Sequence, residues 1–367
     1  MIVYIFFILF IFLLKYSLST MDKGDLRKKK EKRYLNIAAF ILVLLTALRG
    51  SNVGTDTQNY LIMYVHHIPW YSFNEVYAAF INSPFVFFLF KTFSVLHLPP
   101  QILLGTISLI YISAIVRLIN KFSTDKLYSF LCFFLIIGLY EFSVPALKQC
   151  VAMGCILHAF LYLYDGKYTL SVLLMIVAYY SHKTSLVFFF GFFLYFIRDK
   201  KYYYFVIGSF LIICLVFSRL VLSTLLDLLN DEHYKIYMDE SGNYTWVTFF
   251  YYLLIVLSAL MFYKSYNINN KSDSHIMYGY AFFVLGLQSL SSVIPSAFRL
   301  ATYYLPFVTV LLPCSFSSGG KKGNLYKNAV MIFLLLFYFY VNRNSGNIVP
   351  YKFCWQEYDI PNIYFGG

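Results

Sequence analysis

The sequence has little charge, and acidic residues are the scarcer sign. Only 13% of its 367 residues are Asp, Glu, Lys or Arg, with 17 Asp+Glu against 29 Lys+Arg and a net charge of +12. Average soluble proteins carry about 25% charged residues. A chain that is also 60% hydrophobic has too little polar surface to cover a core in water. This composition excludes a soluble enzyme and an intrinsically disordered chain.

Cysteine is present but lacks the spacing of a functional motif. None of the six cysteines forms a CxxC pair, and five lie in or beside apolar runs. They are typical of small buried hydrophobic residues, which excludes a disulfide scaffold and gives no metal site. An internal repeat of about 20–50 residues is also absent from the sequence.

Long apolar runs dominate the chain instead. They predict an all-α polytopic integral membrane protein, with residues 1–367 as one multispan domain and about twelve transmembrane helices. The predicted spans are 1–14, 35–48, 99–117, 127–141, 147–164, 169–181, 184–197, 203–222, 246–263, 276–294, 299–316 and 328–342.

The cations orient these spans. Twenty of the 29 Lys+Arg lie in alternate connections, eight of them in segment 15–33. The positive-inside rule makes that side cytoplasmic and places both termini outside. Because the charges sit between apolar runs, we do not expect nucleic acid as a partner. The first run is predicted to be a retained span, since its basic block follows it and no small-residue cleavage site is present.

Three longer segments are predicted on the outer side. They are 49–98, 223–245 and the C-terminal tail 343–367. Residues 75–97 are apolar but contain Glu75 and Lys91, and counting them as a crossing would reverse the charge pattern. We therefore expect an interfacial or re-entrant helix there, on the outer face.

Nine cations are not explained by the positive-inside rule, and four of them lie at span ends. Cations at the outer ends of spans cost insertion energy. If those ends converge, they form a basic cup that suits an anionic lipid-borne substrate such as a lipid pyrophosphate. The alternative is that the side chains extend to lipid headgroups. The four are Arg49, Lys148, Lys183 and Arg299.

The densest polar stretch directly follows a span. It reads Arg-Gly-Ser-Asn-Val-Gly-Thr-Asp-Thr-Gln-Asn-Tyr from Arg49 to Tyr60. Asp56 within it is placed to cap the next helix or to hold Arg49. The stretch resembles the signature of EpsG-type proteins, the Wzy-like bacterial polysaccharide polymerases.

Three further motifs carry the same resemblance in order, so that it covers roughly residues 35–316. Lys148-Gln149 stands where the family tends to have Arg-Gln. Residues 178–185, with His182, resemble a mid-chain Ala-x-x-x-His pattern, and Arg299 with Tyr303 resembles a late Arg-x-x-x-Tyr element. Lys148 departs from the family, because a lysine keeps the charge but lacks bidentate geometry.

The resemblance implies a glycosyltransferase in the bacterial cytoplasmic membrane that needs no cofactor or metal. It would join oligosaccharide repeat units linked to undecaprenyl pyrophosphate, for an O-antigen, capsule or exopolysaccharide. Its partners would be these lipid-linked glycans, the bilayer, a chain-length regulator and a flippase. The four cations would bind the pyrophosphate, and His182 or Asp56 would be the catalytic base. Supporting residues would be Gly54, Tyr60, Gln149 and Tyr303.

Two other classes of function stay open. An O-antigen ligase-like enzyme would share the substrate, although 223–245 is short for its usual outer loop, and a multispan acyltransferase would have only His158 as a candidate. A transporter or flippase without catalysis would show broken helices in paired halves, and the predicted break near His182 has no evident twin.

Overall fold

The computed structural model is helical throughout its described residues, which are 1–21, 24–75, 80–229, 246–261, 271–317, 319–343 and 348–356. Within these ranges no strand is formed, and the only β pairing is an isolated antiparallel bridge between Arg49 and Phe353. The all-α class predicted from the sequence is confirmed. The chain divides into two compact units: unit 1 (1–121, 126–183 and 334–367) and unit 2 (122–125 and 184–333).

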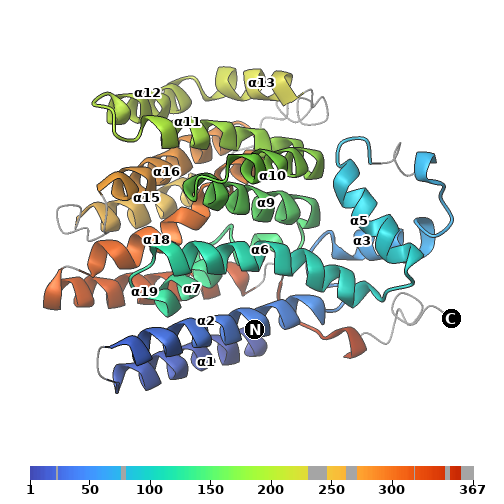
Figure 1. Cartoon of the computed structure of the whole chain (residues 1–367), viewed down its shortest axis with the longest axis horizontal. Helices are drawn as coiled ribbons and strands as arrows, with labels where there is room; N and C mark the ends of the chain where they lie inside the picture. The colour runs from blue at the N-terminus through green and yellow to red at the C-terminus, as the bar shows by residue number, and fades with distance from the viewer. Residues whose placement is uncertain are drawn as a thin grey trace. The chain divides into compact units, whose positions relative to one another are not determined.

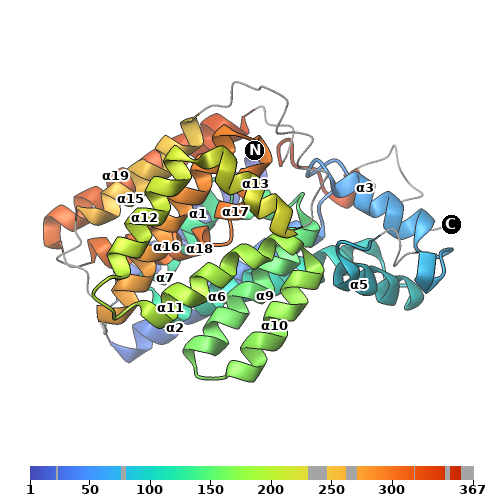
Figure 2. The ribbon, with the colours of Figure 1, turned by 90° about the horizontal axis from the view of Figure 1, so that it is seen from above.

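Unit 1 is built around the helical hairpin of α9 and α10. Its helices are α1 (Ile2–Ser19), α2 (Asp25–Ala47), α3 (Thr57–Ile62), the π-helix η1 (Met63–His67), α5 (Pro84–Val95), α6 (Pro100–Phe122), α7 (Lys126–Leu135), α8 (Tyr140–Ser143), α9 (Leu147–Tyr164) and α10 (Tyr168–Ser181), with the end of α19 and the 3-10 turn η6 (Cys354–Gln356). Nearly four fifths of α9 is buried, whereas α1 is largely exposed. Figures 1 and 2 show α9 and α10 side by side, with α3 and α5 beyond their ends. This part of unit 1, the described residues from 57 to 97, is called the outer lobe below, after the side predicted for it from the sequence.

Unit 2 is packed through aromatic rings. It contains η2 (Lys183–Phe188), α11 (Phe189–Ile197), α12 (Tyr203–Val216), α13 (Ser218–Leu229), α15 (Val247–Leu260), α16 (Lys271–Ser289), η4 (Leu290–Ser292), η5 (Pro295–Ala297), α17 (Phe298–Ala301), α18 (Leu305–Phe316) and most of α19 (Gly320–Asn342). Tyr280 donates to the carbonyl of Gly191 at 2.7 Å, and Tyr304 donates to that of Val187 at 2.8 Å. These hydroxyls satisfy carbonyls of the short 3-10 and α-helical turns, which is what a buried tyrosine requires.

The apolar helices agree with a multi-pass membrane protein. Four described helices are long and apolar enough to cross a membrane, or six if each of two bent pairs is one span. The four are α1, α6, α9 and α19, and five shorter apolar helices accompany them. The count of about twelve spans includes such shorter helices and stays a prediction. At 12 residues α5 is about 18 Å long, too short for a bilayer core of about 30 Å.

Several segments differ in detail from the sequence-based expectation. The basic segment 15–33, expected as a loop, is largely helical, because α1 continues to Ser19 and α2 begins at Asp25. The run 203–222, expected as one span, is bent by 101° between α12 and α13. The segment 223–245, which is predicted on the outer side, begins as the end of α13, and its residues 230–245 lie outside the described residues. In the tail 343–367, residues 344–347 and 357–367 lie outside them as well.

Candidate functional site

Arg49 follows α2 directly and is buried, with 1% of its surface exposed. Its guanidinium donates to the carbonyl of Thr46 at 2.6 Å and to that of Val144 at 2.8 Å. Residues 348–356, here called the strap, run beside it: Gly50 donates to the carbonyl of Lys352, and Cys354 to that of Leu48. The Arg49 side chain is therefore enclosed between the end of α2 and two distant parts of unit 1, the segment before α9 and the strap.

The surroundings of Arg49 are aromatic and not acidic. The guanidinium lies near Tyr140, Tyr4 and Tyr351. None of the described carboxylates forms an ion pair with it. Burial lowers the pKa of the guanidinium, and the three tyrosines oppose that shift. Arginine stays charged in proteins. The Nε atom is buried and has no hydrogen-bond partner among the described residues. The site thus holds a buried positive charge that is incompletely satisfied.

The loop after Arg49 packs against the segment that leads into α9. Gly54 has a φ of +101°, and a Cβ there would lie 3.2 Å from Val144 and 3.3 Å from Pro145. Only glycine tolerates this combination of backbone angle and close approach. Asp56 precedes α3, but its side chain is exposed and makes no capping hydrogen bond. Nor does it pair with Arg49, so neither of the two contacts expected for it is present. Tyr60 is half-buried, with its ring 6.1 Å from that of Phe90.

Lys148 and Gln149 lie in the first turn of α9. Because Gly54 packs closely against Val144 and Pro145, the Arg49–Tyr60 stretch lies alongside this turn. Gln149 is buried, whereas Lys148 is half-buried. The Lys148 Nζ lies 4.6 Å from the centroid of the Phe80 ring, in the outer lobe. Lys148 makes no hydrogen bond or ion pair with any described residue. It is therefore a cation whose donors are available to a ligand.

His182 and Lys183 lie at the same end of unit 1 as Lys148. The predicted helix break is confirmed: α10 ends at Ser181, His182 is extended, and η2 begins at Lys183. Since α9 and α10 are joined by only three residues, 165–167, they run antiparallel. Lys148 lies about 24 Å along α9 from that connection, and His182 lies about 21 Å along α10 from it. Both are therefore at the far end of the hairpin. Both His182 and Lys183 are half-buried, and Lys183 makes no hydrogen bond or ion pair within the described part of the chain.

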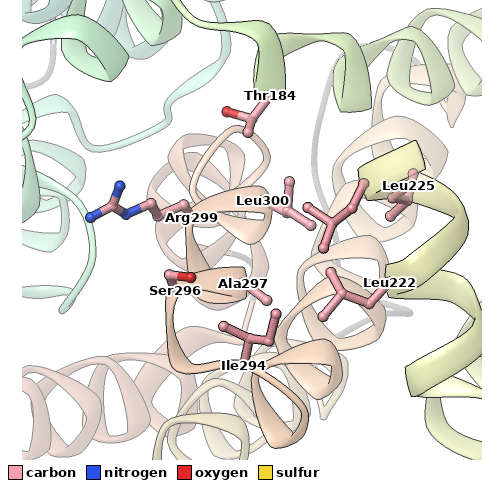
Figure 3. A pocket seen from close by; sticks show the side chains of 9 residues that line it. Thr184, Leu222, Leu225, Ile294, Ser296, Ala297, Arg299 and Leu300 are labelled. Carbon is pink, nitrogen blue, oxygen red and sulfur yellow. The ribbon is translucent and has the colours of Figure 1, made fainter. Parts of the chain in front are cut away.

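In unit 2, Arg299 lies on the short helix α17 at the edge of an apolar pocket (Figure 3). The pocket is narrow: its cavity volume is about 30 Å³, within about 400 Å³ of space that includes its open mouth, and its apolar lining comes from α13, η5, α17 and Ile294. The half-buried Arg299 extends away from Leu222 and Leu225 in Figure 3. Tyr303 is buried, and its hydroxyl lies 3.1 Å from that of Thr184, the residue after Lys183. The pocket therefore combines an apolar interior with one cation at its rim.

The structure also shows polar residues that sequence reasoning did not place. Lys91 is 7% exposed and donates to the carbonyls of Ile68 and Tyr71. His158 has partners at both ring nitrogens, Arg117 at 2.8 Å and Ser113 at 3.2 Å. Their spacing of 41 and 45 residues gives no local signal in the sequence. The acyltransferase candidate His158 is thus engaged within α6 and α9.

Comparison with known proteins identifies a family. The model of the EpsG family matches residues 32–353, which is most of the chain. No curated protein and no solved structure matches.

Proposed function

The chain belongs to the EpsG family of Wzy-like polysaccharide polymerases, and on that premise we propose that it joins oligosaccharide repeat units carried on undecaprenyl pyrophosphate. The family supports a polysaccharide polymerase that acts on lipid-linked glycans in a membrane. The undecaprenyl carrier, the outer face of the bacterial cytoplasmic membrane and the partners (a chain-length regulator and a flippase) are parts of the proposal.

The proposed reaction is a glycosyl transfer. A hydroxyl of the incoming unit attacks the anomeric carbon of the growing chain and forms the new C–O bond. The bond from that carbon to the pyrophosphate breaks, and the lipid pyrophosphate leaves with the electron pair. The proton of the attacking hydroxyl passes to a base. The protein must therefore supply positive charge at the leaving group and a base near the acceptor.

The observation that carries the proposal is the end of the α9–α10 hairpin, where Lys148 and Lys183 keep their donors free of described hydrogen-bond partners. Unpaired cations at one end of a membrane-spanning hairpin are costly unless they bind an anion. We propose that both contact the pyrophosphate and that His182, beside Lys183, or the exposed Asp56 accepts the proton.

We propose that Arg299 also contacts the pyrophosphate. Its place beside a small, open apolar pocket suits a ligand in which an isoprenoid chain meets a charged group, because hydrocarbon can lie along the apolar mouth while the phosphate meets the guanidinium. Tyr303 would support this region through its contact with Thr184.

Arg49 differs from the other three cations. Its contact with the pyrophosphate stays a prediction, and in the arrangement seen here it would require the strap to move away. We propose that Arg49 acts mainly as a positioning residue, since its bond to Val144 holds the start of α9 and hence Lys148 in place. Gly54, Tyr60 and Gln149 would help to hold the same segment in place through their packing.

The test is the pattern of lipid-linked products in a deletion strain. Loss of a polymerase leaves single repeat units on the lipid. Loss of a flippase leaves no surface polymer, and loss of a ligase leaves long polymer that is not attached. Long lipid-linked chains in the deletion strain would refute the proposal. As a second expected result, purified protein should elongate lipid-linked repeat units without other proteins.

A further inference from the structure

Residues 66–75 of the outer lobe, here called the outer ridge, expose an unusual set of side chains. All ten residues except Ile68 are exposed, and Trp70 is 84% exposed, Phe73 56% and Tyr71 39%. Large aromatic side chains that project from a surface are typical of contact surfaces. The outer ridge therefore has the features of a ligand-binding surface.

The backbone of the outer ridge is held firmly from beneath. The buried Lys91 of α5 donates to the carbonyl of Ile68 at 2.9 Å and to that of Tyr71 at 2.8 Å. The amide of Ser72 donates to the Glu75 carboxylate at 2.7 Å, and the amide of Glu75 donates to the Ser72 hydroxyl at 3.3 Å. A buried ammonium bound to backbone carbonyls fixes the turn that presents Trp70. Such a preorganised surface loses little conformational entropy when it binds a ligand.

The outer lobe, which carries the outer ridge, also contacts Lys148. Phe80 of the same lobe contacts Lys148, and Figures 1 and 2 show α3 and α5 beyond the ends of α9 and α10. A pyrophosphate held at Lys148 has its lipid on the membrane side, so its sugars extend outward, toward the lobe.

The chemistry of the outer ridge matches a sugar better than a lipid surface. A pyranose ring has an apolar C–H face, which stacks on an aromatic ring, and an edge of hydroxyls, which needs hydrogen-bond partners. The adjacent rings of Trp70 and Tyr71 are flanked along the chain by the exposed imidazole of His67 and the exposed carboxylate of Glu75. A carboxylate within the patch is costly against hydrocarbon but accepts hydrogen bonds from hydroxyls readily.

We propose that the outer ridge binds the oligosaccharide of the lipid-linked substrate, with Trp70 stacked on a sugar ring. This inference rests on the proposed function, because it takes the ligand to be the repeat-unit glycan.

The experiment uses the full chain in nanodiscs, with Trp246→Phe and Trp355→Phe so that Trp70 is the one remaining tryptophan of three. The probe is oligosaccharide released by mild acid from the organism's own surface polymer. We expect a saturable change in Trp70 fluorescence on addition of the probe, and no quenching of Trp70 by brominated lipids. Calorimetry should show about tenfold weaker binding for Trp70→Ala.

Two replacements separate stacking from membrane insertion. Trp70→Tyr keeps an aromatic face and should retain most of the binding, whereas Trp70→Leu stays hydrophobic but should lose it. Phe88→Ala is the matched control, because Phe88 is 57% exposed in the same lobe but lies on α5. Quenching by brominated lipid together with wild-type binding in Trp70→Leu would overturn the inference in favour of a membrane anchor.

The remaining outcomes distinguish the inference from the proposed function. If the deletion strain accumulates single repeat units but Trp70→Ala binds the probe as wild type does, the inference is wrong and the polymerase stands. If the deletion strain still makes long lipid-linked chains, the polymerase proposal fails, while the fluorescence titration still decides whether the outer ridge binds glycan.

Discussion

Replacement of Arg49 by Ala tests whether this residue is mainly structural. The substitution removes two hydrogen bonds from a charged donor, to the carbonyls of Thr46 and Val144. Each is worth about 1.5–3 kcal/mol. Removing the charge also relieves a desolvation penalty of several kcal/mol for an ion without an acidic partner. We therefore expect a net loss of about 2–3 kcal/mol in the free energy of unfolding.

Arg49→Lys should also lower the free energy of unfolding. A single ammonium keeps the charge but lacks the planar fork that reaches both carbonyls at once. We expect a loss of about 1.5–3 kcal/mol, because one of the two hydrogen bonds is lost while the buried charge keeps its desolvation penalty.

Thermal unfolding in detergent, followed with a thiol-reactive fluorescent dye, is a suitable assay. Five of the six cysteines are buried, so the dye reports their exposure on unfolding. Lys148→Ala is the matched control, since it removes a cation that makes no hydrogen bond or ion pair with the described residues. If Arg49→Ala unfolded at the wild-type temperature but made no polymer, the guanidinium would act on substrate and the positioning role would be refuted.

Three further predictions concern the reaction and the topology. Lys148→Ala should slow elongation by purified protein about 10²–10³-fold without lowering the unfolding temperature, because the leaving group loses a stabilising charge. Lys148→Arg should remain active. A wild-type product ladder from Lys148→Ala would exclude Lys148 from the site. One of His182→Ala and Asp56→Asn should slow elongation about 10²–10⁴-fold while lipid-linked substrate still binds, as expected on loss of a general base; wild-type rates from both would mean that neither is the base. In a background without reactive native thiols, Ser72→Cys should react with an impermeant maleimide on intact cells and Lys322→Cys only after permeabilisation, and the reverse pattern would overturn the proposed orientation.

The sequence predicted the features that depend on local pattern. Long apolar runs gave the all-α class, and the polar pair His182-Lys183 within an apolar stretch marked the end of α10. The order of charged and apolar residues is sufficient for such features, because helix ends follow from local hydrogen bonding and burial.

The sequence did not predict features that depend on distant partners. Arg49 was expected in an open cup because it follows a span, yet it is enclosed by Val144 and by the strap, about 95 and 300 residues further along. The bend at Phe217 also has no local signal, since neither proline nor glycine is present there. A position along a helix can be read from the sequence, whereas the direction that a side chain faces is set by packing.

The pairing of the strap with residues 48–50 has a consequence for biosynthesis. Unit 1 contains α1 and also residues 334–367, so its earlier helices wait until this much later segment has been made. At about 5–20 residues per second, roughly 15–60 s separate the synthesis of Arg49 from that of Phe353. During this interval the nascent chain carries a guanidinium that has not yet met its final surroundings. In ribosome-stalled chains that end before residue 348, the peptide after α2 should therefore be open to proteolysis. Unit 2 is already fully synthesised in such chains, because its residues lie between 122 and 333.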